Sequence, residues 1–153
     1  MTAEAASTGS QVEETAPRSR LRVRRLSKRY GNVQALDEVD FGDWNGRSFA
    51  ELEEDPLWHE WNSRRATAAT PGGERMGEAV ARTVAHLEQA ATGPNQGPVM
   101  LVTHCDIIRG VIAFYLGLSL DHILRFDIDP GSVSTIEVGA GQARIIRINE
   151  VPA

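Results

Sequence analysis

The sequence has little cysteine and no long hydrophobic run. Cys105 is its single cysteine, which excludes an internal disulfide, and no CxxC motif or Cys/His cluster indicates a structural metal. The longest apolar run, near Gly110–Leu118, is too short to span a bilayer, and the N-terminus has no uninterrupted apolar signal region. We therefore predict a cytoplasmic protein with no metal, no other cofactor and no membrane partner.

Acidic residues are absent from one short basic stretch, whereas the rest of the chain is acidic. The formal net charge is -5, yet residues 18–29 hold 7 basic side chains and no acidic one, while residues 30–153 hold 9 basic and 18 acidic side chains. The basic run could neutralise the phosphates of a nucleic acid, but the acidic body would repel the same polymer. We expect a solvated basic face and no nucleic-acid partner.

The length of 153 residues and the hydrophobic content of 41% predict one domain with a real core. Residues 1–17 contain almost no large apolar side chain, so we expect a disordered tail followed by a domain over residues 18–153. Between Ser19 and Tyr30 the apolar residues are unevenly spaced and separated by arginines, which favours a helix over a strand.

Residues 36–46 have no sustained hydrophobic period and contain two glycines, which indicates a loop held down by Phe41 and Trp44. Ser48 and Glu51 then have the capping-box spacing that begins a helix. The apolar anchors of this helical segment are expected to be Phe49, Leu52 and Trp61.

The C-terminal half alternates helices and strands. Apolar residues at three-to-four spacing predict an amphipathic helix over 74–91, and the apolar run Val99–Thr103 predicts a buried parallel strand. The other predicted elements are helices over 107–116 and 119–126 and a hairpin of strands over 132–138 and 143–148. This order indicates a layered α/β fold.

His104 lies where the predicted strand ends and the next helix begins. Ligands collect at the carboxyl ends of strands in open α/β sheets, and the first N–H groups of a helix favour anions, so a histidine there can contact a phosphate. An equal alternative is a partly buried histidine bonded to a neighbouring loop. Asp106 is expected to cap the helix, because its carboxylate would repel a phosphate.

Glu38 is the second candidate, since it lies among three aspartates in the predicted loop. Clustered carboxylates disfavour one another's ionised form, and an aromatic cover would add desolvation, so one of them can stay protonated and act as an acid. A solvated acidic loop is the commoner alternative, and the loop lacks the glycine and glutamate positions of an EF-hand. The remaining histidines are expected to be structural or exposed: His59, His86 and His122.

Four ordered motifs between about Tyr30 and Glu150 resemble the histidine phosphatase superfamily. L-D-E-V-D-F-G-D-W-N-G at 36–46 resembles the family loop L-x-E-x-D-F-G-x-W-x-G, and P-G-G-E at 71–74 resembles the turn before a long helix with an arginine, here Arg82. V-M-L-V-T-H-C-D-I-I-R at 99–109 is similar to the strand that bears the second active-site histidine, and residues 125–134 are similar to α-ribazole phosphatase-type bacterial members.

This resemblance implies a three-layer sandwich with a mostly parallel sheet flanked by helices. It also implies a phosphomonoester phosphatase or phosphoglycerate mutase-like protein that acts on a small phosphorylated metabolite through a phosphohistidine. Glu38 would be the proton donor and His104 the second active-site histidine. Arg18 and Cys105 would bind substrate.

The sequence departs from the family pattern in its N-terminal part. It contains no Arg-His-Gly, the family motif that carries the nucleophilic histidine, and only 35 residues precede Leu36. We therefore expect the first strand or strands to be missing and the activity to be impaired. Cys105 and Asp106 stand where the family often has glycine, which narrows the space beside a phosphate. The open alternatives are a non-catalytic phosphate-binding or homo-oligomerising remnant and a truncated gene model of an active phosphatase.

Overall fold

The computed structural model describes residues 29–30, 33–93, 97–139 and 142–152. The expected tail over 1–17, Arg18 and most of the expected helix over 19–30 lie outside the described residues. Its last two residues form strand β1 (Arg29–Tyr30), so the helix prediction is wrong there, because these residues pair with a neighbouring strand.

The fold is a mixed α/β fold with two small sheets. Strand β1 pairs antiparallel with β2 (Val33–Ala35), and β2 pairs parallel with β3 (Met100–Val102) in the order β1-β2-β3. The predicted C-terminal hairpin is confirmed as the antiparallel pair β4 (Val133–Gly139) and β5 (Gln142–Glu150). A three-layer sandwich with a mostly parallel sheet stays a prediction, because only the β2–β3 pairing is parallel among the described strands.

Strand β3 has the predicted position and parallel partner, but the predicted burial is wrong. Met100 and Val102 are 56% and 53% exposed, whereas Leu101 between them is half-buried. Successive side chains of a strand point to opposite faces, so one face of β3 is covered and the other faces solvent. The sequence of β3 is as apolar as that of a strand buried on both faces, but only one of its faces is covered.

Four α-helices and two 3-10 helices complete the described part of the chain. The 3-10 helices are η1 (Gly42–Trp44) and η2 (Leu120–Arg125). The α-helices are α1 (Phe49–Leu52), α2 (Pro56–Ser63), α3 (Met76–Thr92) and α4 (Cys105–Leu116). Helix α4 ends at Gly117, whose φ of 67° gives the left-handed cap that glycine adopts at little cost. No helix in the described ranges combines the length and apolar character needed to cross a membrane.

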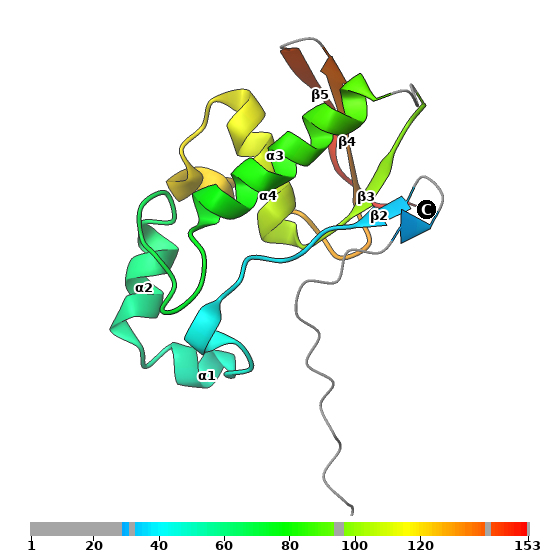
Figure 1. Cartoon of the computed structure of the whole chain (residues 1–153). Coiled ribbons are helices and arrows are strands. Elements are labelled where there is room, and N and C mark those ends of the chain that lie inside the picture. Colours follow the sequence, from blue (N-terminus) through cyan, green and yellow to red (C-terminus); the bar gives the residue numbers. More distant parts are fainter. Residues whose placement is uncertain (1–28, 31–32, 94–96, 140–141, 153) are drawn as a thin grey trace, which may run out of the picture.

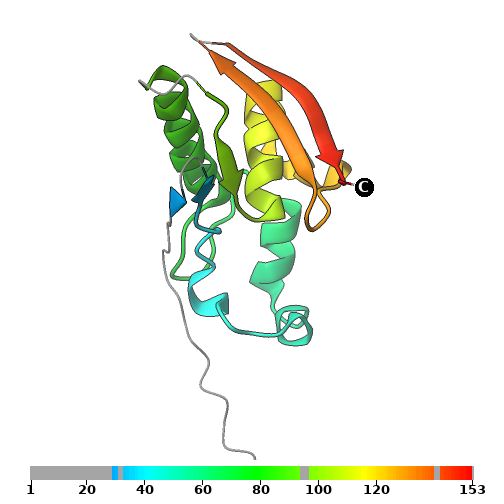
Figure 2. The same ribbon diagram turned by 90° about the vertical axis from the view of Figure 1, so that its right-hand side faces the viewer.

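The main hydrophobic core lies between α3 and α4, and the β4–β5 hairpin runs beside these helices (Figure 1, Figure 2). The 3.6-residue period places the apolar residues of α3 on one face, which confirms the amphipathic pattern read from the sequence. The buried members of this core are Val39, Met76, Ala79, Val80, Val84, Ile107, Val111, Ala113 and Ile123.

A second, aromatic core lies under the loop over 36–46. Trp44, Leu52 and Trp61 are buried in it, and Phe41 contacts both this aromatic core and the main core. Phe41 and Trp44 therefore hold the loop down as predicted. Phe49 is 77% exposed, so its predicted role as an anchor is wrong. The Ser48 capping box confirms the helix start, but that start turns Phe49 outward.

Asp55 connects this aromatic core to helix α2. Its carboxylate accepts hydrogen bonds from Trp44 Nε1 at 3.0 Å, from the backbone N–H of Leu57 at 3.0 Å and from Arg47 at 3.1 Å. The Trp44 indole N–H contributes most to holding the pKa of Asp55 below its usual value, and the Leu57 and Arg47 bonds add to it. Donors favour the ionised form, so they stabilise the fold while the carboxylate is charged.

We predict that Asp55→Asn destabilises the protein at pH 7, and that the difference from the wild type narrows as the pH falls. A carboxyl with a lowered folded-state pKa contributes stability above its unfolded pKa of about 4, and loses that contribution as the pH falls through the folded value. Urea unfolding from pH 7 to pH 3 measures the difference. A difference that stays constant over this range would contradict the prediction.

Candidate functional site

The candidate site forms where β2 and β3 end side by side. The parallel pairing places Ala35 opposite Val102, and Leu36 N donates to Val102 O at 2.9 Å. The segments that follow the two strands therefore leave the sheet at the same place. Glu38 follows β2 and His104 follows β3, and His104 Nε2 lies 3.6 Å from Glu38 Oε2. The structure thus brings the two residues singled out in the sequence to one edge of the sheet.

Both side chains of this pair are open to solvent. The His104 side chain is 54% exposed and that of Glu38 is 52% exposed. The contact is an ion pair only when the imidazole is protonated, and solvent screens it. The predicted desolvation of Glu38 by its aromatic neighbours is wrong, because Phe41 and Trp44 turn into the cores while Glu38 turns out.

His104 is also the residue at which helix α4 begins. It has an extended backbone with φ of -91° and ψ of 155°, and its imidazole makes no capping hydrogen bond. The first N–H groups of a helix have no carbonyl partner within the helix and can donate to an anion. Cys105, the first residue of α4, is exposed at this end. The geometry is compatible with an oxyanion placed next to His104.

Asp106 does not cap the helix as predicted, because α4 begins one residue earlier, at Cys105. Its carboxylate instead accepts from Arg65 at 2.7 Å and from Arg109 at 3.3 Å. The side chains of Arg65 and Arg109 are 7% and 14% exposed, so the three charges are largely removed from water. The two guanidinium groups compensate a carboxylate that would otherwise repel an anion at the helix terminus.

Arg65 was missed in the sequence, and no local pattern could have revealed it. Its partner Asp106 is 41 residues away along the chain, and its guanidinium also lies 4.2 Å from the ring centroid of Trp61. The Asp106–Arg109 pair did carry a signal, since residues three apart on a helix are neighbours. The predicted substrate-binding Arg18 lies outside the described residues.

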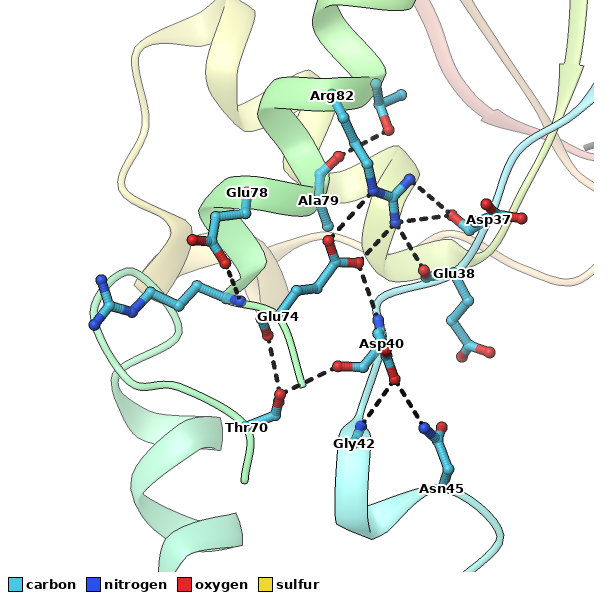
Figure 3. A network of polar contacts seen from close by, with 12 residues as sticks. Asp37, Glu38, Asp40, Gly42, Asn45, Thr70, Glu74, Glu78, Ala79 and Arg82 are labelled. Carbon is cyan, nitrogen blue, oxygen red and sulfur yellow. Dashed lines mark hydrogen bonds and ion pairs between the residues drawn. The ribbon is translucent and has the colours of Figure 1, made fainter. Parts of the chain in front are cut away.

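Asp40 of the acidic loop has a structural role. Its Oδ1 accepts from Gly42 N at 3.0 Å and from Asn45 Nδ2 at 2.9 Å (Figure 3). These bonds fold the loop back on itself at the start of η1. The carboxylates of Asp40 and Glu38 therefore differ in surroundings, although they are two residues apart in the sequence.

The loop lies directly against the turn over 70–74. Glu74 N donates to Asp40 O at 2.9 Å, and the buried Thr70 hydroxyl donates to the same oxygen at 3.1 Å. A Cβ at Gly73 would lie 2.1 Å from Asp40 O and 2.3 Å from Thr70 Oγ1, so only glycine permits this approach. The P-G-G-E motif thus brings the Glu74 side chain to the base of the loop.

The other histidines lie on separate elements. His59 lies on α2 and its ring contacts the backbone oxygen of Glu53 at 2.7 Å, while His86 lies on α3 and His122 on η2. Within the described ranges, no three side chains of His, Cys, Asp or Glu gather in an arrangement that could hold a metal ion.

The sequence model of the histidine phosphatase superfamily (branch 1) matches residues 7–151. Among curated proteins, the bifunctional protein Rv2228c of Mycobacterium tuberculosis is 29% identical over 114 residues, which are 74% of this chain and 31% of that protein. An uncharacterized protein of Mycobacterium bovis, Mb2253c, matches with the same identity and coverage. The chain therefore spans about a third of the length of these relatives.

Solved structures have the same fold at low sequence identity. YhfR of Bacillus stearothermophilus has a TM-score of 0.69 and 21% identity over 79% of this chain and 60% of that one. A putative α-ribazole-5'-P phosphatase of Escherichia coli has a TM-score of 0.59 and 23% identity, over 76% and 60%. A mycobacterial glucosyl-3-phosphoglycerate phosphatase, Rv2419c, has a TM-score of 0.61 and 23% identity, over 75% and 62%.

We predict that Asp106→Ala lowers the free energy of unfolding by about 2–4 kcal/mol, because it leaves Arg65 and Arg109 without their shared carboxylate in a largely buried place. Glu60→Ala is the matched control, since it removes a carboxylate from the exposed pair with Arg64 and is expected to cost about 0.5 kcal/mol or less. Urea denaturation measures both. Equal effects of the two substitutions would contradict the prediction.

Proposed function

We propose that the site accepts the phosphoryl group of a small phosphomonoester, because this chain belongs to the histidine phosphatase superfamily. The observation that carries the proposal is the approach of His104 to Glu38 at 3.6 Å, beside the N-terminus of α4. A basic side chain, a carboxyl group and helix N–H donors at one place are among the components that phosphoryl transfer uses around the transferred group.

In this proposal the substrate phosphate lies at the first N–H groups of α4. His104 donates to a phosphate oxygen, and the backbone N–H of Cys105 donates to another. Arg18 supplies a further cation. Glu38, in its protonated form, gives its proton to the leaving alkoxide oxygen as the P–O bond breaks. The compensation of Asp106 by Arg65 and Arg109 supports an anion here, because it removes a repulsive charge.

The covalent step of the family would need a nucleophilic histidine. In that step a P–N bond forms to the histidine while the P–O bond to the alcohol breaks, and water then cleaves the phosphohistidine. This sequence contains no Arg-His-Gly, so we propose that turnover by this chain is impaired. Phosphate binding does not require that motif in full, because the α4 terminus and His104 remain.

The names of two structural neighbours point to the substrate class. They are a putative α-ribazole-5'-P phosphatase and a glucosyl-3-phosphoglycerate phosphatase, and both names describe phosphate esters of small sugar-containing or glycerate molecules. We propose a phosphorylated small metabolite of this kind for the present chain. The proposal includes a single domain over residues 18–153, a three-layer sandwich with a mostly parallel sheet, and a place in the cytoplasm.

We predict that the purified chain turns over p-nitrophenyl phosphate little or not at all, yet binds inorganic phosphate next to His104. Phosphate titration should shift the NMR amide signals of Cys105 and Asp106, and His104→Ala should weaken the fitted affinity about 5–10-fold, the loss expected for one solvent-exposed hydrogen bond of about 1 kcal/mol. His59→Ala is the matched control, because it removes an exposed imidazole on another helix and should leave the affinity unchanged.

Two results would contradict this prediction in different ways. Robust hydrolysis that His104→Ala abolishes would overturn the proposed impairment and leave the site intact. Phosphate shifts that avoid the start of α4, or that His104→Ala does not change, would overturn the site itself.

A second candidate function is a non-catalytic protein that associates through the sheet. The exposed face of β3 favours it, because Met100 and Val102 are more than half exposed and β3 is the last strand in its sheet within the described residues. We predict in that case a concentration-dependent oligomer by size-exclusion chromatography, which Met100→Lys with Val102→Lys converts to monomer. A monomer at all concentrations with cooperative unfolding would exclude this candidate.

A further inference from the structure

We infer that Arg82, together with Glu74, is a positioning residue that fixes the backbone of Glu38 so that the Glu38 carboxylate faces His104. The inference rests on the proposed function, since it assigns a purpose to the Glu38–His104 contact. Arg82 lies on α3, far from Glu38 in the sequence, and does not contact the Glu38 carboxylate in any described hydrogen bond.

The guanidinium of Arg82 reaches from α3 to the backbone of the loop. Its NH2 group donates to the carbonyl oxygen of Glu38 at 2.8 Å. NH1 and NH2 each lie 3.4 Å from the carbonyl oxygen of Asp37. Figure 3 shows the guanidinium beside these two carbonyl groups, with the Glu38 side chain extending away from it. The planar fork of arginine suits two adjacent acceptors of this kind.

Glu74 ties the other side of the same loop. Its Oε1 accepts from Arg82 NH2 at 2.7 Å and from the backbone N–H of Asp40 at 3.0 Å, and its Oε2 accepts from Arg82 Nε at 3.3 Å. One guanidinium and one carboxylate therefore hold the backbone on both sides of residue 38. Asp37, Glu38 and Asp40 are joined to α3 and its preceding turn as one unit.

This arrangement determines the direction of the Glu38 side chain. Val39 is 3% exposed and belongs to the main core, whereas its neighbour Glu38 is exposed to solvent. With the carbonyl oxygen held by Arg82, the peptide plane cannot rotate freely, and the carboxylate stays on the side of His104. Without Arg82 the exposed loop would sample other orientations of Glu38.

The Arg82–Glu74 pair contributes more to the position of the loop backbone than to the free energy of unfolding. The two side chains are 38% and 22% exposed, so solvent screens their attraction. A merely structural ion pair at this place would affect unfolding and leave the environment of His104 unchanged. A positioning pair changes that environment even in a variant that stays folded.

The test follows the imidazole ring of His104 by NMR at constant pH in the full chain, with the His104 signals assigned from their loss in His104→Ala. Glu38→Gln removes the charge from the carboxylate, and the resulting shift of the His104 ring signals defines the signature of the contact. We expect Arg82→Ala to reproduce at least half of that shift. Arg82→Lys should give a smaller part, because a compact ammonium lacks the planar fork whose Nε and two NH groups contact Glu74 and the carbonyl groups.

Arg64→Ala is the matched control, since Arg64 is a mostly exposed arginine whose ion pair is with Glu60 on α2. It should leave the His104 signals in place. If Arg82→Ala does not fold, Glu74→Gln replaces it, and we again expect at least half of the shift. This substitution keeps the shape of the side chain and weakens its hydrogen bonds with Arg82 and with Asp40 N.

The outcomes separate the two proposals. If Glu38→Gln leaves the His104 ring unchanged, the Glu38–His104 contact is absent and the proposed function fails with it. If Glu38→Gln shifts the ring but neither Arg82→Ala nor Glu74→Gln does, the contact stands and the positioning role of Arg82 is overturned. A shift of the His104 ring signals in Glu38→Gln and also in Arg82→Ala or Glu74→Gln supports the inference.

Discussion

The parallel pairing of β2 with β3 is the constraint on which the candidate site depends. Parallel strands end at the same edge of a sheet, so the segments that follow them must leave it together. One of these segments carries Glu38 and the other carries His104, which explains how residues 66 positions apart come within 3.6 Å. The edge is also where α4 begins, so helix N–H donors lie next to the histidine.

The carboxylates near this edge of the sheet differ in the groups that pair with them. Asp106 is paired with two largely buried arginines, Glu74 is paired with Arg82, and the Oδ1 of Asp40 accepts from the loop that contains it. Each of these groups holds one segment against another. Glu38 differs from them because its side chain is half exposed and its contact is with His104. In the proposed function this exposed carboxyl group is the one that reaches a ligand, whereas the structural carboxylates are bonded to fixed donors.

Much of the fold and part of the site could be predicted from the sequence, and each success rests on a local rule. The three-to-four apolar spacing predicted α3, the Ser48 capping box predicted the start of α1, and the alternation in the last third predicted the hairpin. The failures have two causes, one in the packing of distant segments and one in the local geometry of a helix start. The burial of β3 was wrong because it depends on what covers each face, and the position of Phe49 was wrong because a helix start fixes which way its first side chain turns.

The sequence by itself determined the family, the order of elements from α1 onward and the two candidate residues, because motifs and hydrophobic periods are properties of neighbours along the chain. Only the tertiary structure decided that Asp106 binds Arg65 instead of capping a helix, and that Arg82 holds the backbone of Glu38. These contacts join residues 41 and 44 positions apart. Such a contact forms when the packing of whole helices and strands brings two distant segments together, and no pattern among neighbouring residues predicts which segments will meet.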